Sequence, residues 1–293
     1  GRTILFTELG EGGGKTARVY VRGTDGSPAV RLGDGQAHAL SPDGKSVLGD
    51  FANAKFTYAG TTSTFTRRDG KFFVNTDGPD GRLADYEIKY AFGVRPLQQY
   101  LIELPGGRLQ ALGIAWDSRP KTQGGQRWFH LYPNQNIKAG DPLHWTGVQQ
   151  NWNFQCAECH STNLRKNYDA KSGTFDSKWD EINVACEACH GPGSSHIAWA
   201  NKEGDWQALA ASKGLALALD ERKGVTWTPM AETGNAKRSA PRTTARELGM
   251  CARCHGRASR ISDDYVHGKP PQDTHRLALL EDGLYWNDGQ MRD

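Results

Sequence analysis

Six cysteines constrain this chain more than any other feature of its sequence. They form three Cys-x-x-Cys pairs with none left over, and a histidine follows each pair at once, giving CAECH, CEACH and CARCH. Two thiols separated by two residues can reach the two vinyl-derived carbons on one edge of a haem, and the adjacent histidine is then held beneath the iron. The pattern predicts three covalently attached haem c groups. Their residues are Cys156, Cys159 and His160, then Cys186, Cys189 and His190, then Cys251, Cys254 and His255.

Other chemistries that use Cys-x-x-Cys pairs explain the pattern less well. A structural zinc site takes four ligands, so two pairs would close one site and leave the third pair without a partner. A redox-active pair of the thioredoxin kind needs a βαβ context, which is absent, and gives no reason for three copies. With nine histidines in 293 residues, a histidine after all three pairs has a chance on the order of 3 in 100,000. Haem is therefore favoured over zinc and disulfides.

The second axial position of each iron decides between an electron carrier and an enzyme. An iron with two strong protein ligands exchanges electrons, whereas an open iron can bind and transform a substrate. The three proximal residues leave six of the nine histidines, twice the number needed. We therefore expect mainly bis-histidine haems. The first distal candidates are His196, His144 and His267, and the further candidates are His275, His130 and His38.

His196 is the strongest of these candidates. It follows His190 by six residues in HGPGSSH, where the Gly-Pro-Gly segment turns the chain sharply. Such a turn does not carry His196 to the far face of its own porphyrin, so we expect it to serve a neighbouring haem. His144 and His267 lie in loops flanked by Gly and Pro, and the alternative for each is a hydrogen-bonding role.

Spacing and composition add three expectations about the haem region. The short stretch between the first two motifs predicts that their haems lie close together. The Ala/Leu-rich segment 205–224 has a composition that suits a scaffold helix broken near Gly214. Nearby cations could pair with haem propionates, although a solvated surface is the alternative. These cations are Arg165, Lys166, Arg253, Arg257 and Arg260.

The signals for β-structure are concentrated in the first half. Residues 1–48 contain short apolar runs between Asp-Gly turns and resemble one blade of a β-propeller. Residues 49–139 alternate in KFFVN and YEIKY, as half-buried antiparallel strands do, with a turn at Asp69-Gly70. Short helices, loops and haem motifs follow in residues 140–293. We expect an α+β fold with low regular structure, in which a β-rich N-terminal half of antiparallel strands precedes a haem-binding half of helices and loops.

Charge and hydropathy exclude some classes of partner. The net charge of 36 − 33 = +3 is too near balance to indicate nucleic acid or an anionic membrane. No apolar run approaches the ~18 residues of a transmembrane segment. Each ferric haem with two ionised propionates adds about −1, so three would leave the protein near neutrality. Copies of the chain could then approach one another without strong repulsion.

Several long phrases resemble multihaem c-type cytochromes that are often joined to tetratricopeptide repeats. They include DYEIKYAFGVRPLQQYLIELPGG, NWNFQCAECHSTNL and VACEACHGPGSSHIAW. The CHGPGxxH element is similar to one in the tetrahaem cytochrome of the hydroxylamine pathway. The resemblance spans about residues 48–293. It implies an exported electron-transfer protein with mostly bis-histidine haems, and it favours His196 and then His144, His267 and His275 as ligands.

We therefore expect residues 140–293 to form a trihaem cytochrome c domain that relays electrons and is not an enzyme. Haem is attached to CxxCH outside the energy-transducing membrane, which predicts an extracytoplasmic location, in the periplasm or at the cell surface and beyond. The expected partners are redox proteins, solid or extracellular electron acceptors, and further copies of the chain in an oligomer or filament. The first alternative is a haem enzyme with one open iron that acts on a small nitrogen or oxygen compound. A sensor or docking module with structural haems is the second.

Overall fold

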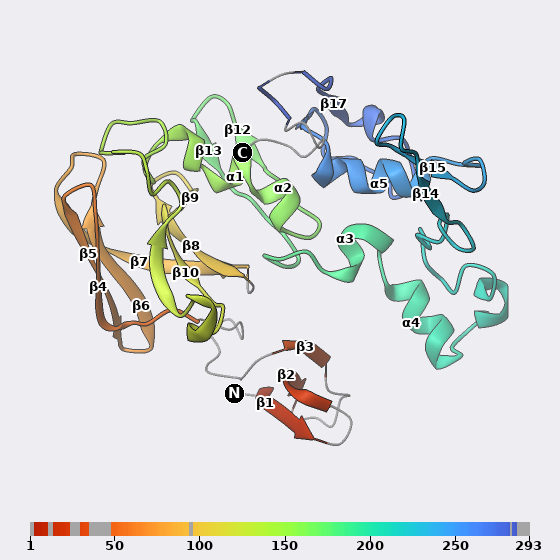
Figure 1. The fold of residues 1–293 in the computed structure, drawn as a ribbon, viewed down its shortest axis with the longest axis horizontal. Helices are drawn as coiled ribbons and strands as arrows, with labels where there is room; N and C mark the ends of the chain where they lie inside the picture. The colour runs from red at the N-terminus through yellow and green to blue at the C-terminus, as the bar shows by residue number, and fades with distance from the viewer. Residues whose placement is uncertain are drawn as a thin grey trace. The chain divides into compact units, whose positions relative to one another are not determined.

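The computed structural model of the chain consists of two compact units (Figure 1). The first comprises Gly1–Gln155 and Ala170–Phe175, and the second comprises Cys156–Asp169 and Asp176–Asp293. All six cysteines lie in the second unit. The structure describes residues 3–10, 14–23, 30–34, 48–93, 96–281 and 283–285.

An eight-stranded antiparallel sheet forms most of the first unit (Figure 1). Seven strands follow the order β11-β10-β8-β7-β6-β5-β4, and β9 pairs with β8. The predicted turn at Asp69-Gly70 is confirmed, because both residues have positive φ, 49° and 76°, as a two-residue hairpin turn of type I′ requires. The strands are β4 (Ala52–Tyr58), β5 (Thr61–Arg68), β6 (Lys71–Asp77), β7 (Leu83–Phe92), β8 (Leu97–Leu104), β9 (Arg108–Ala111), β10 (Ile114–Asp117) and β11 (Arg127–His130).

Alternating burial along these strands builds an aromatic core. In β6, Phe72, Val74 and Thr76 are buried while their neighbours are more exposed, which is the period-two pattern that the sequence predicts. Phe65 on β5 is completely buried and stacks on Trp128 of β11, with ring centroids 3.6 Å apart and planes 9° from parallel. This unit therefore has a protein core of its own.

A separate three-stranded antiparallel sheet precedes it, formed by β1 (Thr3–Gly10), β2 (Gly14–Gly23) and β3 (Val30–Asp34). The described part of residues 1–48 is thus β-structure. His38 and two of the predicted Asp-Gly turns, those at Asp25-Gly26 and Asp43-Gly44, lie outside the described residues.

The second unit has short elements joined by loops. Its helices are α2 (Ala157–His160), α3 (Cys186–His190), α4 (Ser194–Asn201) and α5 (Arg246–His255). Its strands are β12 (Tyr168–Asp169), β14 (Trp227–Pro229), β15 (Ala236–Arg238), β16 (Ala258–Arg260) and β17 (His275–Leu277), and its 3-10 turns are η3 (Trp206–Leu209) and η4 (Pro271–Asp273). The first unit also holds α1 (Trp152–Gln155), β13 (Thr174–Phe175), η1 (Lys121–Gln123) and η2 (Val148–Gln150). A strand-rich antiparallel half with few helices agrees with the expected α+β class.

The helix expected in residues 205–224 is wrong. Only the 3-10 turn η3 forms, and turns and loop follow it. Lys213, Gly214 and Leu219 have positive φ, which interrupts any helix. A side chain at Gly214 would collide with the carbonyl oxygen of Ser195, so close packing on α4 overrides the helical composition of this segment.

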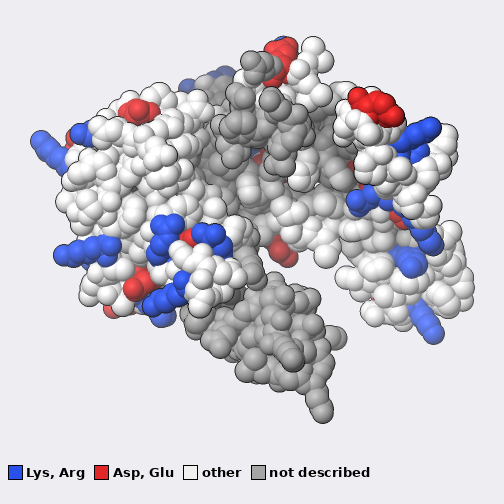
Figure 2. Space-filling view, in the orientation of Figure 1, with Lys and Arg blue, Asp and Glu red and all other residues white. Residues whose placement is uncertain are grey.

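The surface carries charges of both signs. On the face drawn in Figure 2, the Lys and Arg side chains of the described residues are interspersed with Asp and Glu in both units. Among the described residues, no helix combines the length and the apolar character that a bilayer span requires.

Candidate haem-binding sites

Each CxxCH motif lies on a short helix, which explains its spacing. The first motif occupies α2 and the residue before it, the second occupies α3, and the third forms the end of α5. Residues three and four apart lie on one face of a helix, so the two thiols and the imidazole of each motif project from the same side. No disulfide joins the six cysteines, all of which lie among the described residues.

The second motif has the clearest ligand geometry. The Nδ1 atom of His190 lies 2.8 Å from the carbonyl oxygen of Leu217. Because a carbonyl only accepts, Nδ1 carries the proton and donates it. This leaves Nε2 as the basic nitrogen, which is how an imidazole that ligates a metal is usually held.

His196 is held in the same way. It lies on α4, and its Nδ1 donates to the carbonyl oxygen of Lys213 over 2.6 Å. Its ring stacks on Trp199, with centroids 5.5 Å apart. Both carbonyl acceptors come from segment 205–224, which the sequence identified only as scaffold. Its role is to orient two imidazoles, and backbone acceptors leave no residue-type signal that could reveal this.

His267 lies against the second motif. Its Nε2 donates to the carbonyl oxygen of Ala188 over 3.2 Å, and a Cβ placed on Gly191 would lie 3.2 Å from its ring. Burial lowers the pKa of His267, which favours the neutral imidazole that a metal needs.

His275 is buried and contacts Glu158, the acidic residue within the first motif. Its Nδ1 lies 2.8 Å from Thr274 Oγ1, and its Nε2 lies 3.3 Å from Glu158 Oε1. Burial alone would raise the pKa of Glu158, but the hydrogen bond from His275 and the charges of Arg260 and Arg253 outweigh it and bring that pKa to about 2. Sequence reasoning missed Glu158, because an acidic residue between two haem cysteines has no signature until its arginine partners are placed beside it.

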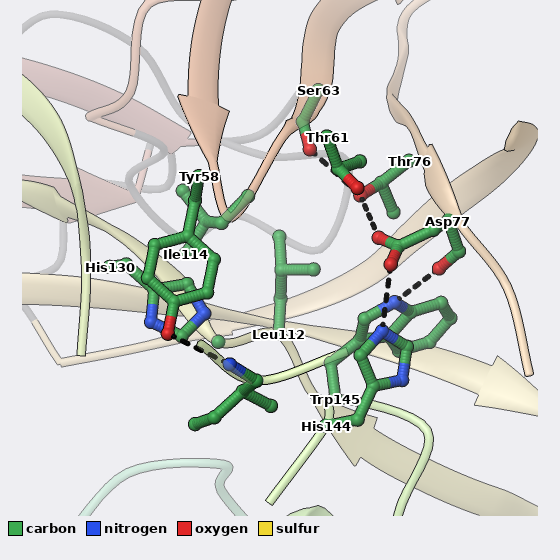
Figure 3. A pocket seen from close by; sticks show the side chains of 12 residues that line it. Tyr58, Thr61, Ser63, Thr76, Asp77, Leu112, Ile114, His130, His144 and Trp145 are labelled. Atoms are coloured by element: carbon green, nitrogen blue, oxygen red, sulfur yellow. Dashed lines mark hydrogen bonds and ion pairs between the residues drawn. The ribbon is translucent and has the colours of Figure 1, made fainter. Parts of the chain in front are cut away.

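His144 and His130 line a pocket in the first unit (Figure 3). The ring of His144 is held at both nitrogens, by Thr146 Oγ1 at 2.8 Å and by Asp77 Oδ2 at 3.2 Å. His130 stacks on Tyr58 at 3.5 Å, and burial lowers its pKa to about 4. The structure therefore places these two candidates in one pocket and His196, His267 and His275 in the other unit. His38 lies outside the described residues.

The described part of the second unit exposes more large apolar side chains than it buries, as expected if haem forms part of its core. Within its described residues, the buried apolar side chains are few: Ala157, Leu164, Ile182, Leu217, Met250 and Tyr285. Large apolar side chains more than half exposed there are Tyr168, Val184, Ile197, Leu248, Ile261, Val266, Leu279 and Leu280. A flat apolar macrocycle supplies the missing burial partner for surfaces of this kind.

Arg253 fits the polar edge of such a group. Its Nε atom is buried and has no hydrogen-bond partner among the described residues, although its Nη2 is bonded to Glu158. A free guanidinium donor within a CxxCH motif suits a haem propionate. Arg260 is engaged with protein groups instead, through Glu158, the carbonyl oxygen of Leu164 and Asp263.

Comparison with known proteins agrees with this site. The family described as Cytochrome c554 and c-prime matches residues 121–191, a region that contains the first two CxxCH motifs. No curated protein and no solved structure matches the chain. Together, the family match and the geometry of the motifs support a c-type cytochrome that holds covalently bound haem and carries electrons.

Proposed function

We propose that the chain is an extracytoplasmic trihaem c-type cytochrome that relays electrons through closely spaced, mainly bis-histidine haems. The observation that carries the proposal is the matched orientation of His190 and His196, each of which donates from Nδ1 to a backbone carbonyl. His190 is a proximal residue and His196 is the first distal candidate. Both kinds of ligand therefore have Nδ1 protonated and Nε2 available for iron.

The ligand set follows the motifs. Cys156, Cys159, Cys186, Cys189, Cys251 and Cys254 would form the thioethers, and His160, His190 and His255 would be the proximal ligands. His196 leads the distal set, followed by His144 and His267, with His275, His130 and His38 as further candidates. For His144, His267 and His275, ligation through Nε2 requires that a hydrogen bond to Asp77, to the Ala188 carbonyl or to Glu158 open.

Haem supplies reversible one-electron exchange, and the chain supplies its position and surroundings. The carbonyl oxygens of Leu217 and Lys213 select the ligating nitrogen of His190 and His196. Arg253 offers a donor for a propionate. Two protein ligands on each iron would leave no open coordination position, which would suit a relay rather than a catalyst.

The proposed partners are redox proteins, solid or extracellular acceptors, and other copies of the chain in a filament. The near-neutral charge expected with haem bound and the interspersed charges in Figure 2 favour self-association. Electron microscopy of the purified protein at high concentration tests the filament. A population of monomers alone would contradict it.

Two measurements on the purified protein test the relay. Intact-mass spectrometry should show three covalently attached haems, and ferric EPR should show low-spin signals alone. Fewer than three haems would contradict the trihaem assignment. A high-spin component would favour the alternative of a haem enzyme with an open iron.

A further inference from the structure

We propose that the Glu158–Arg253 ion pair docks the first haem-attachment motif against the third and couples their haems electrostatically. The inference rests on the proposed function and adds two positioning residues to it. Spacing along the sequence favours proximity of the first and second haems, whereas the charged contact joins the first motif to the third.

The pair lies inside the two motifs themselves. Glu158 stands between Cys156 and Cys159, and Arg253 stands between Cys251 and Cys254. The Arg253 Nη2 atom is 3.1 Å from Glu158 Oε1, and the two side chains are 14% and 13% exposed. Beside them, Cys159 Sγ lies 3.8 Å from the carbonyl oxygen of Cys254. The two attachment helices α2 and α5 are therefore in direct contact at their thiol-bearing ends.

Neighbouring groups hold both partners rigidly. The other oxygen of Glu158 accepts from Arg260 Nη1 over 2.5 Å, and His275 Nε2 lies 3.3 Å from its first oxygen. The Arg253 guanidinium lies 4.0 Å from the ring centre of Tyr265. A carboxylate held at both oxygens cannot turn away to solvent, so its charge stays fixed between the two motifs.

Because the pair is buried, its two charges would act strongly on nearby groups such as a haem iron. Charges interact strongly where water does not screen them, and removing one partner of a buried pair leaves the other uncompensated. An oxidised haem carries one more positive charge than a reduced haem. Loss of the Glu158 charge therefore favours reduction of a nearby haem, and loss of the Arg253 charge favours oxidation.

The test is a redox titration of the intact holoprotein and its variants, followed by visible absorbance and EPR. In Glu158→Gln, two of the three midpoint potentials should rise, and in Arg253→Gln the same two should fall. Glu187→Gln is the matched control, because Glu187 is a carboxylate within the second motif whose Oε1 accepts from the Gly193 amide. It should shift at most one midpoint, and a different one.

Glu158→Asp covers the case in which the glutamine variant does not mature. Aspartate keeps the charge, so the two midpoints should stay near those of the natural protein, and Arg253→Gln still tests the sign. Shifts of opposite sign in the same two midpoints support the coupling. Unmoved potentials, or a shift of one haem alone, overturn it. A protein with fewer than three haems would instead refute the proposed function, and mass spectrometry separates that failure from this one.

Discussion

The Nδ1 atom of His190 lies 2.8 Å from the carbonyl oxygen of Leu217, a residue 27 positions further along the chain. This hydrogen bond selects Nε2 as the nitrogen that can reach an iron. His196 repeats the arrangement with Lys213. A loop that bears no ligand thus orients two imidazoles of the second unit.

Replacing His190 by Met should change the potential of one haem and not the number of haems. On the proposed ligand set the thioethers would form at Cys186 and Cys189, so the haem should remain attached. A thioether ligand favours reduced iron, so one midpoint should rise by on the order of 0.1 V. Redox titration together with intact mass measures both quantities. Three unchanged midpoints would show that His190 is not an axial ligand.

Replacing His196 by Gln should convert one haem from low spin to high spin. The amide is a poor ligand for haem iron, so one sixth position opens, and added imidazole should restore the low-spin EPR signal. Trp199→Phe is the matched control, because it keeps an aromatic ring beside His196 and should leave the spectrum unchanged. An unaltered spectrum in His196→Gln would assign His196 to a hydrogen-bonding role alone.

Replacing Phe65 by Ala should destabilise the first unit by about 3–5 kcal/mol, the usual cost of truncating a buried phenylalanine. Phe65 is fully buried against Trp128, so the cavity opens in the aromatic core. Denaturant unfolding followed by tryptophan fluorescence measures the loss, while the haem content should remain at three. Loss of haem from this variant would show that the second unit depends on the core of the first.

Replacing Asp117 by Asn should weaken the first unit at neutral pH and reduce its sensitivity to acid. Arg119 donates to both carboxylate oxygens, from Nη2 over 2.6 Å and from Nε over 3.0 Å, and these bonds lower the pKa of Asp117. The stabilisation is complete above the ordinary aspartate pKa and is lost as the pH falls through the lowered value.

We expect Asp117→Asn to cost about 1–2 kcal/mol at neutral pH. The difference from the natural protein should shrink as the pH falls below the ordinary aspartate pKa of about 3.9. Denaturant unfolding at several pH values measures this. If the difference in the free energy of unfolding did not change with pH, the charge of the Asp117 carboxylate would not contribute to stability.

The confirmed predictions about the fold depended on local sequence patterns. The Asp69-Gly70 turn and the alternation in β6 were readable because each depends on neighbouring residues along one strand. The helix expected near Gly214 failed because tertiary contact with Ser195 overrides composition. Neither the Leu217 carbonyl nor the arginine partners of Glu158 could be foreseen, since their pairings join residues distant in sequence.

The sequence by itself predicts where haem would be attached, because two thiols and an imidazole at positions i, i+3 and i+4 share one face wherever the motif forms a helix. Only the tertiary structure decided which imidazole nitrogen is left without a hydrogen and which two motifs are joined by an ion pair. Hydrogen bonds such as His190 to Leu217 and ion pairs such as Glu158 to Arg253 form only after packing brings distant segments within about 3 Å of each other.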